Sequence, residues 1–474
     1  MIDITKQRRA VNVYNLLIYR IIKIILNKLN RLFWLTLTDI QLQQKETIMI
    51  NTLNQPMTLK CGVVLPNRLA KSAMTEGLAD PRGNPTSAHN QLYKTWAEGG
   101  TGLLFTGNIM VDSRYLERAG NVILEDAQQL LSFKSWAHAA QSNNNHCWVQ
   151  LNHPGRQCAR LINAQPLSPS DVQLDMLGNF GKPRAMQEED ILDVIQRFVT
   201  SAELVKEAGF SGVQIHCAHG YLLSQFLSPN TNKREDKWGG SLVNRARIIR
   251  TIIQQVRQAV GSSFPLSVKL NSADFQKGGF TLEECIQVAS WLAEDSIDLL
   301  EISGGTYEQM SLLGVEATEV RDSTRRREAY FIEYAEQIKA KANVPVMITG
   351  GFRSRAVMEA AIEKGEVDLI GLARPLCTQT DCSNQLMQGA LDQLDDYEHK
   401  LVLGRGFWGN NSPLNMIKAI NAFGQVGFYY WQIIRLSKGL APQPHLGVFR
   451  AFIRHIINDF RLAMRRRKES KANT

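Results

Sequence analysis

Residues 209–240 read GFSGVQIHCAHGYLLSQFLSPNTNKREDKWGG, and this stretch indicates the fold more directly than any other part of the chain. Its apolar run at 213–215 follows a glycine-containing turn and a helix-like segment over 188–208, so it predicts a short buried strand. A helix that leads into a buried strand is one unit of an α/β fold. Two histidines and a tyrosine follow where that strand opens into a long loop, a position that carries chemistry in such folds.

These three polar residues are His216, His219 and Tyr221. The two histidines can each donate a hydrogen bond, and the tyrosine can donate a proton, to one small molecule bound beside them. The HxxH spacing is also found in metal pairs, but no carboxylate or third ligand accompanies it in the motif. The sequence therefore favours an organic substrate over a metal ion here.

Eight short apolar runs, separated by segments of helical length, lie between residues 60 and 375. They are Leu69–Met74, Gly102–Thr106, Cys147–Leu151, Gly212–His216, Leu266–Leu270, Asp298–Ile302, Val344–Thr349 and Val367–Leu372. Eight successive strand-then-helix units predict a (β/α)8 TIM barrel, an α/β fold. A Rossmann domain is not expected, because no G-x-G-x-x-G follows any of these runs.

The last two predicted strands are followed by glycine-rich turns that indicate a phosphate site. Gly350 and Gly351 follow the seventh strand, and Ala373 and Arg374 follow the eighth. Glycines let backbone N–H groups approach an anion closely, and barrels commonly bind phosphate at this place. Tight turns that simply require glycine are the alternative.

Lys269 ends the fifth predicted strand, and its residue type fits three roles. As a nucleophile it would form a Schiff base, which makes this a phosphate-binding barrel lyase. As a fixed cation it would stabilise an anion that forms on a bound ring. A structural ion pair with Glu301 is the third reading.

Charge divides the chain into a basic leader, an acidic middle and a basic tail. Residues 1–48 hold eight Lys or Arg against three Asp or Glu, and residues 400–474 hold thirteen against two. With a total of +9, residues 49–399 therefore carry −7. We expect the barrel to occupy 49–399, and its acidic character argues against nucleic-acid binding.

The two extensions are apolar as well as basic. The segment 15–37 is interrupted by charged residues, so it is not expected to span a bilayer. One alternative is a leader that lies on an anionic membrane. The other is a disordered or non-native segment, with Met49 as the native start of the chain. The tail residues 449–468 predict a basic amphipathic helix. That helix either docks on the barrel or contacts a membrane surface or partner.

Seven single cysteines and the lack of a secretory signal predict a cytoplasmic protein, peripheral to the inner membrane if the tails bind it. Cys377 and Cys382 are the closest pair, which is weak evidence for a metal, so none is expected. The oligomeric state stays open, with a homo-oligomer among the alternatives.

At this point five motifs carry a resemblance over about residues 51–397. They are PNRLAKSAMTEG at 66–77, QLNHPGRQ at 150–157, IHCAHGYLLSQFLSPNTNKREDKWGGS at 215–241, KLNSADF at 269–275, and ITGGF with GLARP at 348–352 and 371–375. In this order they resemble the old yellow enzymes, the FMN-dependent ene-reductases also called NADH:flavin oxidoreductases.

The resemblance implies an FMN site. The residues that match its flavin contacts are Ser72, Ala73, Met74, Thr75, Gly107, Gln150 and Lys269, and those that match its phosphate cradle are Gly350, Gly351, Ala373 and Arg374. Many relatives have arginine in place of Lys269, and a lysine supplies the charge without the bidentate fork.

The resemblance also implies the chemistry. NADH or NADPH reduces the flavin directly, because no second nucleotide-binding half is visible, and hydride then passes to the activated C=C bond of a small enone-type substrate. His216 and His219 match the pair that binds the carbonyl oxygen, and Tyr221 matches the acid that protonates the α-carbon. A barrel that only supports membrane-binding tails is a further alternative, against which these intact residues count.

Overall fold

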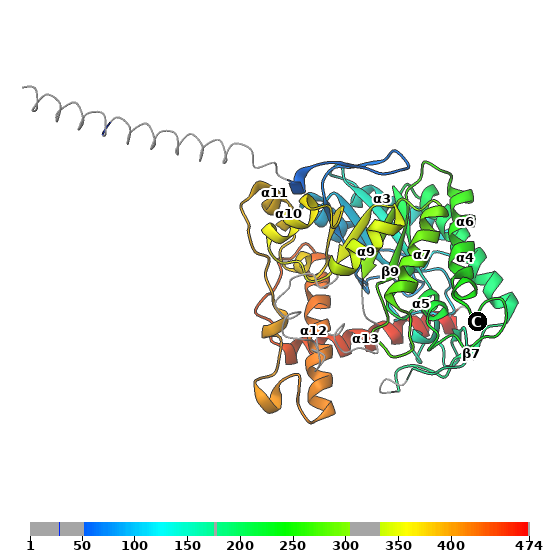
Figure 1. Ribbon diagram of the computed structural model, residues 1–474. Coiled ribbons are helices and arrows are strands. Elements are labelled where there is room, and N and C mark those ends of the chain that lie inside the picture. The colour runs from blue at the N-terminus through cyan, green and yellow to red at the C-terminus, as the bar shows by residue number, and fades with distance from the viewer. Residues whose placement is uncertain (1–27, 29–51, 175–177, 304–331, 473–474) are drawn as a thin grey trace, which may run out of the picture. The chain divides into compact units, whose positions relative to one another are not determined.

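The computed structural model describes residue 28 and residues 52–174, 178–303 and 332–472. Eight parallel strands close into a barrel in the order β10-β11-β12-β3-β4-β5-β8-β9 (Figure 1). The strands are β3 (Leu69–Lys71), β4 (Leu103–Met110), β5 (His146–Asn152), β8 (Gly212–Cys217), β9 (Leu266–Asn271), β10 (Leu299–Ser303), β11 (Val346–Thr349) and β12 (Leu369–Leu372). All eight fall on the apolar runs of the sequence, so the prediction of a TIM barrel is confirmed.

The interior of the barrel has an apolar layer near the start of the strands and a polar layer near their ends. Residues two apart on a strand point to the same side, so β5 places Trp148 in the apolar layer and Gln150 in the polar layer. A hairpin of β1 (Met57–Thr58) and β2 (Val64–Leu65) packs against the apolar layer. The buried side chains of this cluster are Met57, Leu59, Leu65, Ala70, Leu103, Phe105, Trp148, Leu299, Met347 and Leu369.

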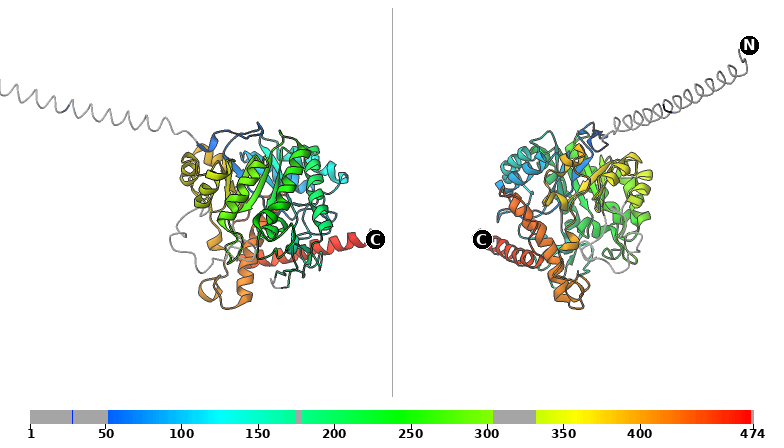
Figure 2. Two further views of the ribbon diagram at one scale, coloured as in Figure 1. Left: turned by 45° about the vertical axis from the view of Figure 1, so that its right-hand side comes forward. Right: turned by 90° about the vertical axis from the view of Figure 1, so that its left-hand side faces the viewer.

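Helices cover the outside of the barrel (Figure 2). They are α2 (Ser87–Glu98), α3 (Leu130–Ala140), α4 (Glu188–Glu207), α6 (Leu242–Val260), α7 (Leu282–Glu294), α9 (Ile332–Ala342), α10 (Arg355–Glu363) and α11 (Cys382–Gln388). In α6, Ser241 caps the N-terminus by accepting a hydrogen bond from the Asn244 amide at 3.4 Å, and Ile248, Ile252 and Val256 recur at helical spacing on the buried face.

Shorter elements decorate the loops: α5 (Leu222–Leu227), the paired β6 (Leu167–Ser168) and β7 (Arg184–Ala185), and the 3-10 helices η1 (Thr52–Asn54), η2 (Ala127–Gln129), η3 (Gly155–Gln157), η5 (Arg374–Cys377), η6 (Glu398–Lys400) and η7 (Gly406–Trp408). After them come two long helices, α12 (Asn415–Leu436) and α13 (Val448–Ala472), which pack together (orange and red in Figure 1).

Helix α13 contains residues 449–468, for which the sequence predicts a basic amphipathic helix. Across the described residues, no helix has the length and apolar character required to cross a bilayer. The leader expected over residues 1–48 lies outside the described residues, apart from residue 28.

Candidate active site

The polar layer of the barrel interior is one connected hydrogen-bond network. Gln150 Nε2 donates to Gln214 Oε1 at 2.7 Å, and Gln214 Nε2 donates to Glu301 Oε2 at 2.9 Å. Thr349 Oγ1 donates to Glu301 Oε1 at 2.7 Å, and Lys269 Nζ lies 2.9 Å from the same oxygen. These side chains come from five strands, so the network fixes polar groups across the width of the barrel.

The Lys269–Glu301 contact is a buried ion pair. The two side chains are 3% and 0% exposed. An ammonium held by a carboxylate is a fixed cation, whereas a Schiff-base nucleophile requires an unprotonated amine. A buried charge without a partner is costly, so the buried Lys269 ammonium requires a carboxylate such as that of Glu301 beside it. The geometry favours a fixed positive charge at Lys269, the fourth of the six residues of β9.

His216, the fifth residue of β8, is positioned as a hydrogen-bond donor. Its Nδ1 accepts a hydrogen bond from the backbone N–H of Ala218 at 3.2 Å, which leaves the proton of the neutral ring on Nε2. Burial lowers the pKa of His216 well below its ordinary value, and His219 and Lys269 lower it further. The ring is therefore neutral at physiological pH and presents one N–H group.

His219 follows in a strained backbone conformation. Its φ is 60°, in the left-handed region that non-glycine residues rarely adopt, and its backbone N–H donates to Asn271 Oδ1 at 3.1 Å. Its Nε2 lies 2.8 Å from Ser303 Oγ, and its ring centroid is 5.1 Å from that of His216. Burial, and next the charge of Lys269, lower the pKa of His219 well below its ordinary value.

The structure brings Tyr221 to the same place. Its ring centroid lies 4.9 Å from that of His216 at an interplanar angle of 77°, and the residue is 3% exposed. The phenolic oxygen accepts a hydrogen bond from Asn108 Nδ2 at 3.4 Å. Within the described residues, no group of three or more His, Cys, Asp or Glu side chains could hold a metal ion. The rings of the two histidines and the tyrosine therefore form one cluster that begins at the end of β8.

Asn108 reaches Tyr221 because β4 contains a bulge. Phe105 pairs with Trp148 of β5 but Asn108 pairs with Gln150, so β4 has one extra residue between these pairs. The bulge releases the N–H of Gly107, which donates to Glu76 Oε1 at 2.8 Å. A Cβ on Gly107 would lie 2.6 Å from the backbone carbonyl oxygen of Met74, so glycine is required there. Gly107 lies one residue beyond the predicted strand Gly102–Thr106, so the predicted strand revealed neither the bulge nor Asn108.

The segment Ser72–Thr75 connects the polar layer to this cluster. Ser72 Oγ lies 2.6 Å from Thr349 Oγ1, at the edge of the polar layer. At the other end, Thr75 Oγ1 donates its one proton to Asn108 Oδ1 at 2.6 Å and lies 3.2 Å from Glu117 Oε2. Between them Ala73 and Met74 are half-buried. Glu117, which sequence reasoning missed, also accepts from Asn108 Nδ2 at 2.8 Å.

The glycines and arginine of the expected phosphate site lie at the ends of β11 and β12. Gly350 and Gly351 adopt φ of 123° and 83°, conformations that favour glycine. Ala373 precedes η5, the short helix that begins with Arg374. Arg374 Nη1 and Arg353 Nη2 each lie 3.1 Å from Glu398 Oε1.

Glu398 is a carboxylate that the sequence did not suggest for this site. Burial raises its pKa, but the hydrogen bond with Asp396 and the charges of Arg374 and Arg353 outweigh burial and lower the pKa overall. Glu398 is therefore an anion at physiological pH. It holds the two guanidinium groups together and reduces the positive charge that they present.

The C-terminal helices contact both sides of the site. The guanidinium of Arg118 lies 4.0 Å from the ring centroid of Tyr430 on α12 and forms an ion pair with Asp459 on α13. The guanidinium of Arg374 lies 5.7 Å from the ring centroid of Tyr429. Consecutive tyrosines of α12 therefore contact the loop after β4 and the glycine-rich turns, a pairing of distant segments that no sequence motif indicates.

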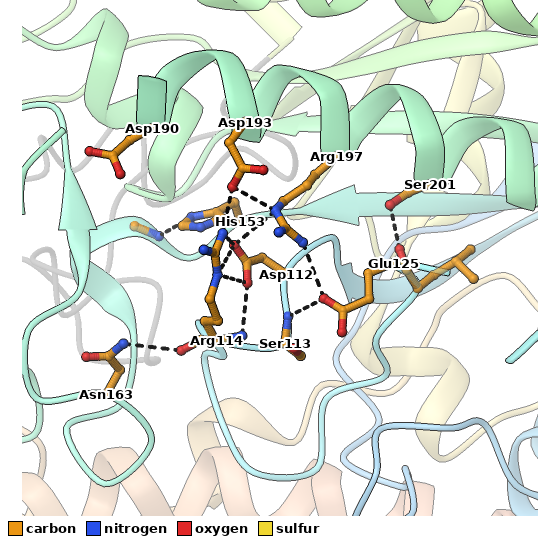
Figure 3. Close-up of polar contacts among 12 residues, drawn as sticks. Asp112, Ser113, Arg114, Glu125, His153, Asn163, Asp190, Asp193, Arg197 and Ser201 are labelled. Atoms are coloured by element: carbon orange, nitrogen blue, oxygen red, sulfur yellow. Dashed lines mark hydrogen bonds and ion pairs between the residues drawn. The ribbon is translucent and has the colours of Figure 1, made fainter. Parts of the chain in front are cut away.

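An ion-pair network anchors the loop that carries Glu117 and Arg118 (Figure 3). Arg114 contacts Asp112 with Nε at 2.9 Å and Nη2 at 2.6 Å, and its Nη2 also lies 2.7 Å from Asp193 of α4. Arg197 of α4 bridges Asp193 at 2.9 Å and Glu125 at 3.4 Å. The network ties the loop after β4 to a rigid helix.

The chain is similar to known flavin oxidoreductases. A model of the NADH:flavin oxidoreductase / NADH oxidase family matches residues 52–393. The chain is 38% identical over 345 residues to the NADH-dependent flavin oxidoreductase iccE of Talaromyces variabilis, covering 68% of this chain and 83% of that protein.

Two solved structures have similar folds. A 2-naphthoyl-CoA reductase in complex with 2-naphthoyl-CoA superposes with a TM-score of 0.67 and 26% identity, covering 72% of this chain and 53% of the other. An old yellow enzyme homologue from Zymomonas mobilis superposes with a TM-score of 0.63 and 22% identity, covering 77% of this chain and 99% of the other. The second likeness concerns the fold alone.

Proposed function

The chain belongs to the NADH:flavin oxidoreductase / NADH oxidase family, which includes the old yellow enzymes, and from this premise we propose that it reduces the activated C=C bond of an α,β-unsaturated carbonyl compound. It is an oxidoreductase that uses FMN with NADH or NADPH. The observation that carries the choice of acceptor is the cluster at the end of β8, where Tyr221 and the N–H donor His216 lie with ring centroids 4.9 Å apart.

The residues present fit an FMN cofactor. The Gln150 amide and the Lys269 cation of the buried polar layer would hold the polar groups of the flavin, and Ser72, Ala73, Met74 and Thr75 would line the same site. Position 107 has no room for a side chain, because the backbone of Met74 approaches Gly107 closely. Gly350 and Gly351, together with Ala373 and Arg374, would receive the phosphate. When bound, FMN would accept hydride from NADH or NADPH and supply it to the β-carbon of the acceptor.

In this proposal the two histidines hold the acceptor. His216 Nε2–H and His219 donate hydrogen bonds to the carbonyl oxygen, on which negative charge develops as the C=C bond is reduced. Both rings are neutral, so they stabilise this charge as donors without giving up a proton. In the structure His219 Nε2 contacts Ser303 Oγ, which would orient the ring until an acceptor binds.

Tyr221 is proposed to give its phenolic proton to the α-carbon, which completes the reduction. The phenolic oxygen then carries a negative charge. Asn108 Nδ2, 3.4 Å from that oxygen, would stabilise the phenolate as a hydrogen-bond donor. Bulk solvent then returns the proton.

One further observation supports a conjugated carbonyl compound as the acceptor. The structural neighbour bound to 2-naphthoyl-CoA binds a ligand whose carbonyl group is attached to an aromatic ring. The acceptor of the present protein would share the carbonyl group beside a conjugated C=C bond.

We assign this activity to residues 49–399, with 1–48 and 400–474 as extensions. A cytoplasmic location would suit the seven cysteines, all of which are free thiols, because a reducing compartment keeps them so.

Anaerobic mixing of the purified holoprotein tests the proposal. After one equivalent of NADH or NADPH has bleached the flavin absorbance, 2-cyclohexen-1-one should restore it and yield cyclohexanone in equal amount. If oxygen or a quinone restores the absorbance and the enone does not, the proposed acceptor class is wrong. Borohydride trapping of a carbonyl substrate on Lys269 would instead support the lyase reading.

A further inference from the structure

Helix α13 leaves an apolar stripe uncovered on its outer side. The stripe comprises Phe449, Ile453, Ile456, Ile457, Phe460 and Met464, each between 40% and 64% exposed. At 3.6 residues per turn these positions fall within roughly 100° of the helix circumference and along about 22 Å of its length. Scattered exposed apolar residues are ordinary, but a continuous stripe along one helix indicates a binding surface.

The opposite side of α13 is fixed to the rest of the protein. Val448, Ala451 and His455 are buried, and glycines of α12 allow the close approach: a Cβ on Gly424 would lie 2.4 Å from Val448 Cγ2, and one on Gly427 would lie 2.7 Å from the carbonyl oxygen of Ala451. The stripe therefore cannot turn inward without breaking this packing.

Contacts with the barrel loops continue along the helix. Asp459 pairs with Arg118, and Arg466 Nη2 donates to the carbonyl oxygen of Ser113 at 3.3 Å. Near the C-terminal end Glu469 pairs with Arg82 at 2.7 Å. These contacts hold α13 against the end of the barrel where the strands finish.

A row of cations runs beside the apolar stripe. Arg450, Arg461, Arg465 and Lys468 lie within roughly 60° of one another on the helix circumference, next to the stripe, and all four are exposed. The only acidic residues after position 399 are Asp459 and Glu469, and both are paired with arginines of the barrel loops. No carboxylate of the tail therefore neutralises the row.

We propose that α13 docks along its length on an anionic lipid membrane, with the apolar stripe inserted at the boundary between head groups and acyl chains. An apolar face bordered by Lys and Arg is the pattern of helices that lie in a membrane interface, and anionic lipids attract such cations. A second copy of this chain, or the basic leader over residues 1–48, would oppose like charges along the same row. Docking would orient the active-site end of the barrel toward the lipid.

Vesicle flotation of the full-length holoprotein tests the docking. We expect binding to phosphatidylcholine vesicles that contain 30% phosphatidylglycerol, and at least tenfold weaker binding to pure phosphatidylcholine. Phe460→Glu places a charge in the stripe and should weaken binding to anionic vesicles at least tenfold. Leu131→Glu is the matched control, because Leu131 is 83% exposed on α3, outside the stripe, and this variant should bind like wild type.

Both variants should retain FMN and their rate with a water-soluble enone, since neither residue belongs to the site, so this test does not depend on the acceptor class. Absence of vesicle binding by the wild type would overturn the proposal. So would binding that survives Phe460→Glu, whichever other segment is then responsible. A wild-type dimer that Phe460→Glu converts to monomer would assign the stripe to a second copy of the chain instead.

Discussion

Asn108 connects the groups on the acid side of the site. Its amide nitrogen donates to Glu117 Oε2 at 2.8 Å and to Tyr221 at 3.4 Å, while its oxygen accepts from Thr75. The shorter bond to Glu117 fixes the amide so that its other N–H points toward the phenol. In the proposed mechanism Asn108 is thus a positioning residue as well as a donor to the phenolate.

Asn108→Leu removes this donor at nearly constant volume. A hydrogen bond to a charged group contributes about 1.5–3 kcal/mol, and because this contact is long we expect the lower end, a loss of about tenfold in enone reduction. Reduction of the flavin by NADH or NADPH should change less than twofold. Stopped-flow absorbance separates the two steps, and an equal slowing of both would indicate a structural defect.

Glu398 places a carboxylate beside Arg374 and Arg353 in the proposed phosphate cradle. Glu398→Gln removes a negative charge beside Arg374 and Arg353 while keeping an oxygen that accepts hydrogen bonds. We expect FMN to bind about three- to tenfold more tightly, since a phosphate near a partly exposed ion pair gains only about 1 kcal/mol from one charge. Flavin fluorescence on titration of the apoprotein measures the Kd.

Glu359→Gln is the matched control for Glu398→Gln. Glu359 pairs with Arg355 at 3.1 Å on α10, so it is also a carboxylate bound to an arginine, but it contacts neither arginine of the cradle. If Glu398→Gln weakens FMN binding, Glu398 acts mainly by orienting the arginines and the electrostatic account is wrong.

At the scale of elements, the strands could be predicted and their irregularity could not. Each strand is buried on both faces, so it appears in the sequence as an apolar run between glycine-rich turns. The bulge at Gly107 depends on Glu76 and the 72–75 segment, which reach β4 only in the folded protein. Local patterns therefore identified the strands that carry His216 and Lys269. They did not identify the direction of the Asn108 side chain, which points toward Tyr221.

The loop after β4 depends on the ion-pair network around Asp112. Burial raises the pKa of Asp112, but hydrogen bonds from Arg114 and nearby positive charges prevail, so the pKa is lowered overall. A carboxyl whose pKa is lower in the folded state stabilises that state above its unfolded pKa, and this contribution is lost as the pH falls through the folded pKa.

Asp112→Asn should therefore lower the free energy of unfolding by about 1–3 kcal/mol at pH 7, because Arg114 and Arg197, whose Nε lies 3.5 Å from Asp112 Oδ2, lose this partner but keep Asp193. The difference from wild type should shrink as the pH falls below about 4. Urea unfolding at pH 7, 5 and 3.5, with FMN saturating in each case, measures it. A difference that stays constant across this range would show that the charge of Asp112 is not what stabilises the loop.

At the scale of the whole molecule, the tail is part of the enzyme's architecture. Residues 394–474 lie beyond the stretch that the family model matches, yet α12 and α13 contact the loops that surround the site. Helical periodicity was sufficient to predict the helix at 449–468. Which of its faces would pack could not be predicted, because the partners Arg118 and Arg82 are more than 300 residues away in the chain.

Arg118→Met keeps an apolar stem but removes the ion pair with Asp459 and the contact with Tyr430. We expect amide exchange in α13 to accelerate at least fivefold while the barrel strands stay protected, because a local opening of α13 costs less than global unfolding. Arg82→Met is the control, since its pair with Glu469 is largely exposed and should contribute little. Hydrogen exchange read by mass spectrometry distinguishes these outcomes, and unchanged exchange in α13 would mean that Arg118 does not hold the helix.

The central claim is that the residues at the end of β8 have separate roles: the two histidines hold the acceptor and Tyr221 protonates it. Anaerobic stopped-flow kinetics of Tyr221→Phe tests this directly, because phenylalanine keeps the ring and loses only the proton donor. We predict flavin reduction by NADH or NADPH within twofold of wild type, and reoxidation by 2-cyclohexen-1-one slowed by about 100-fold or more. Reoxidation at the wild-type rate, or an equal loss in both half-reactions, would contradict the account.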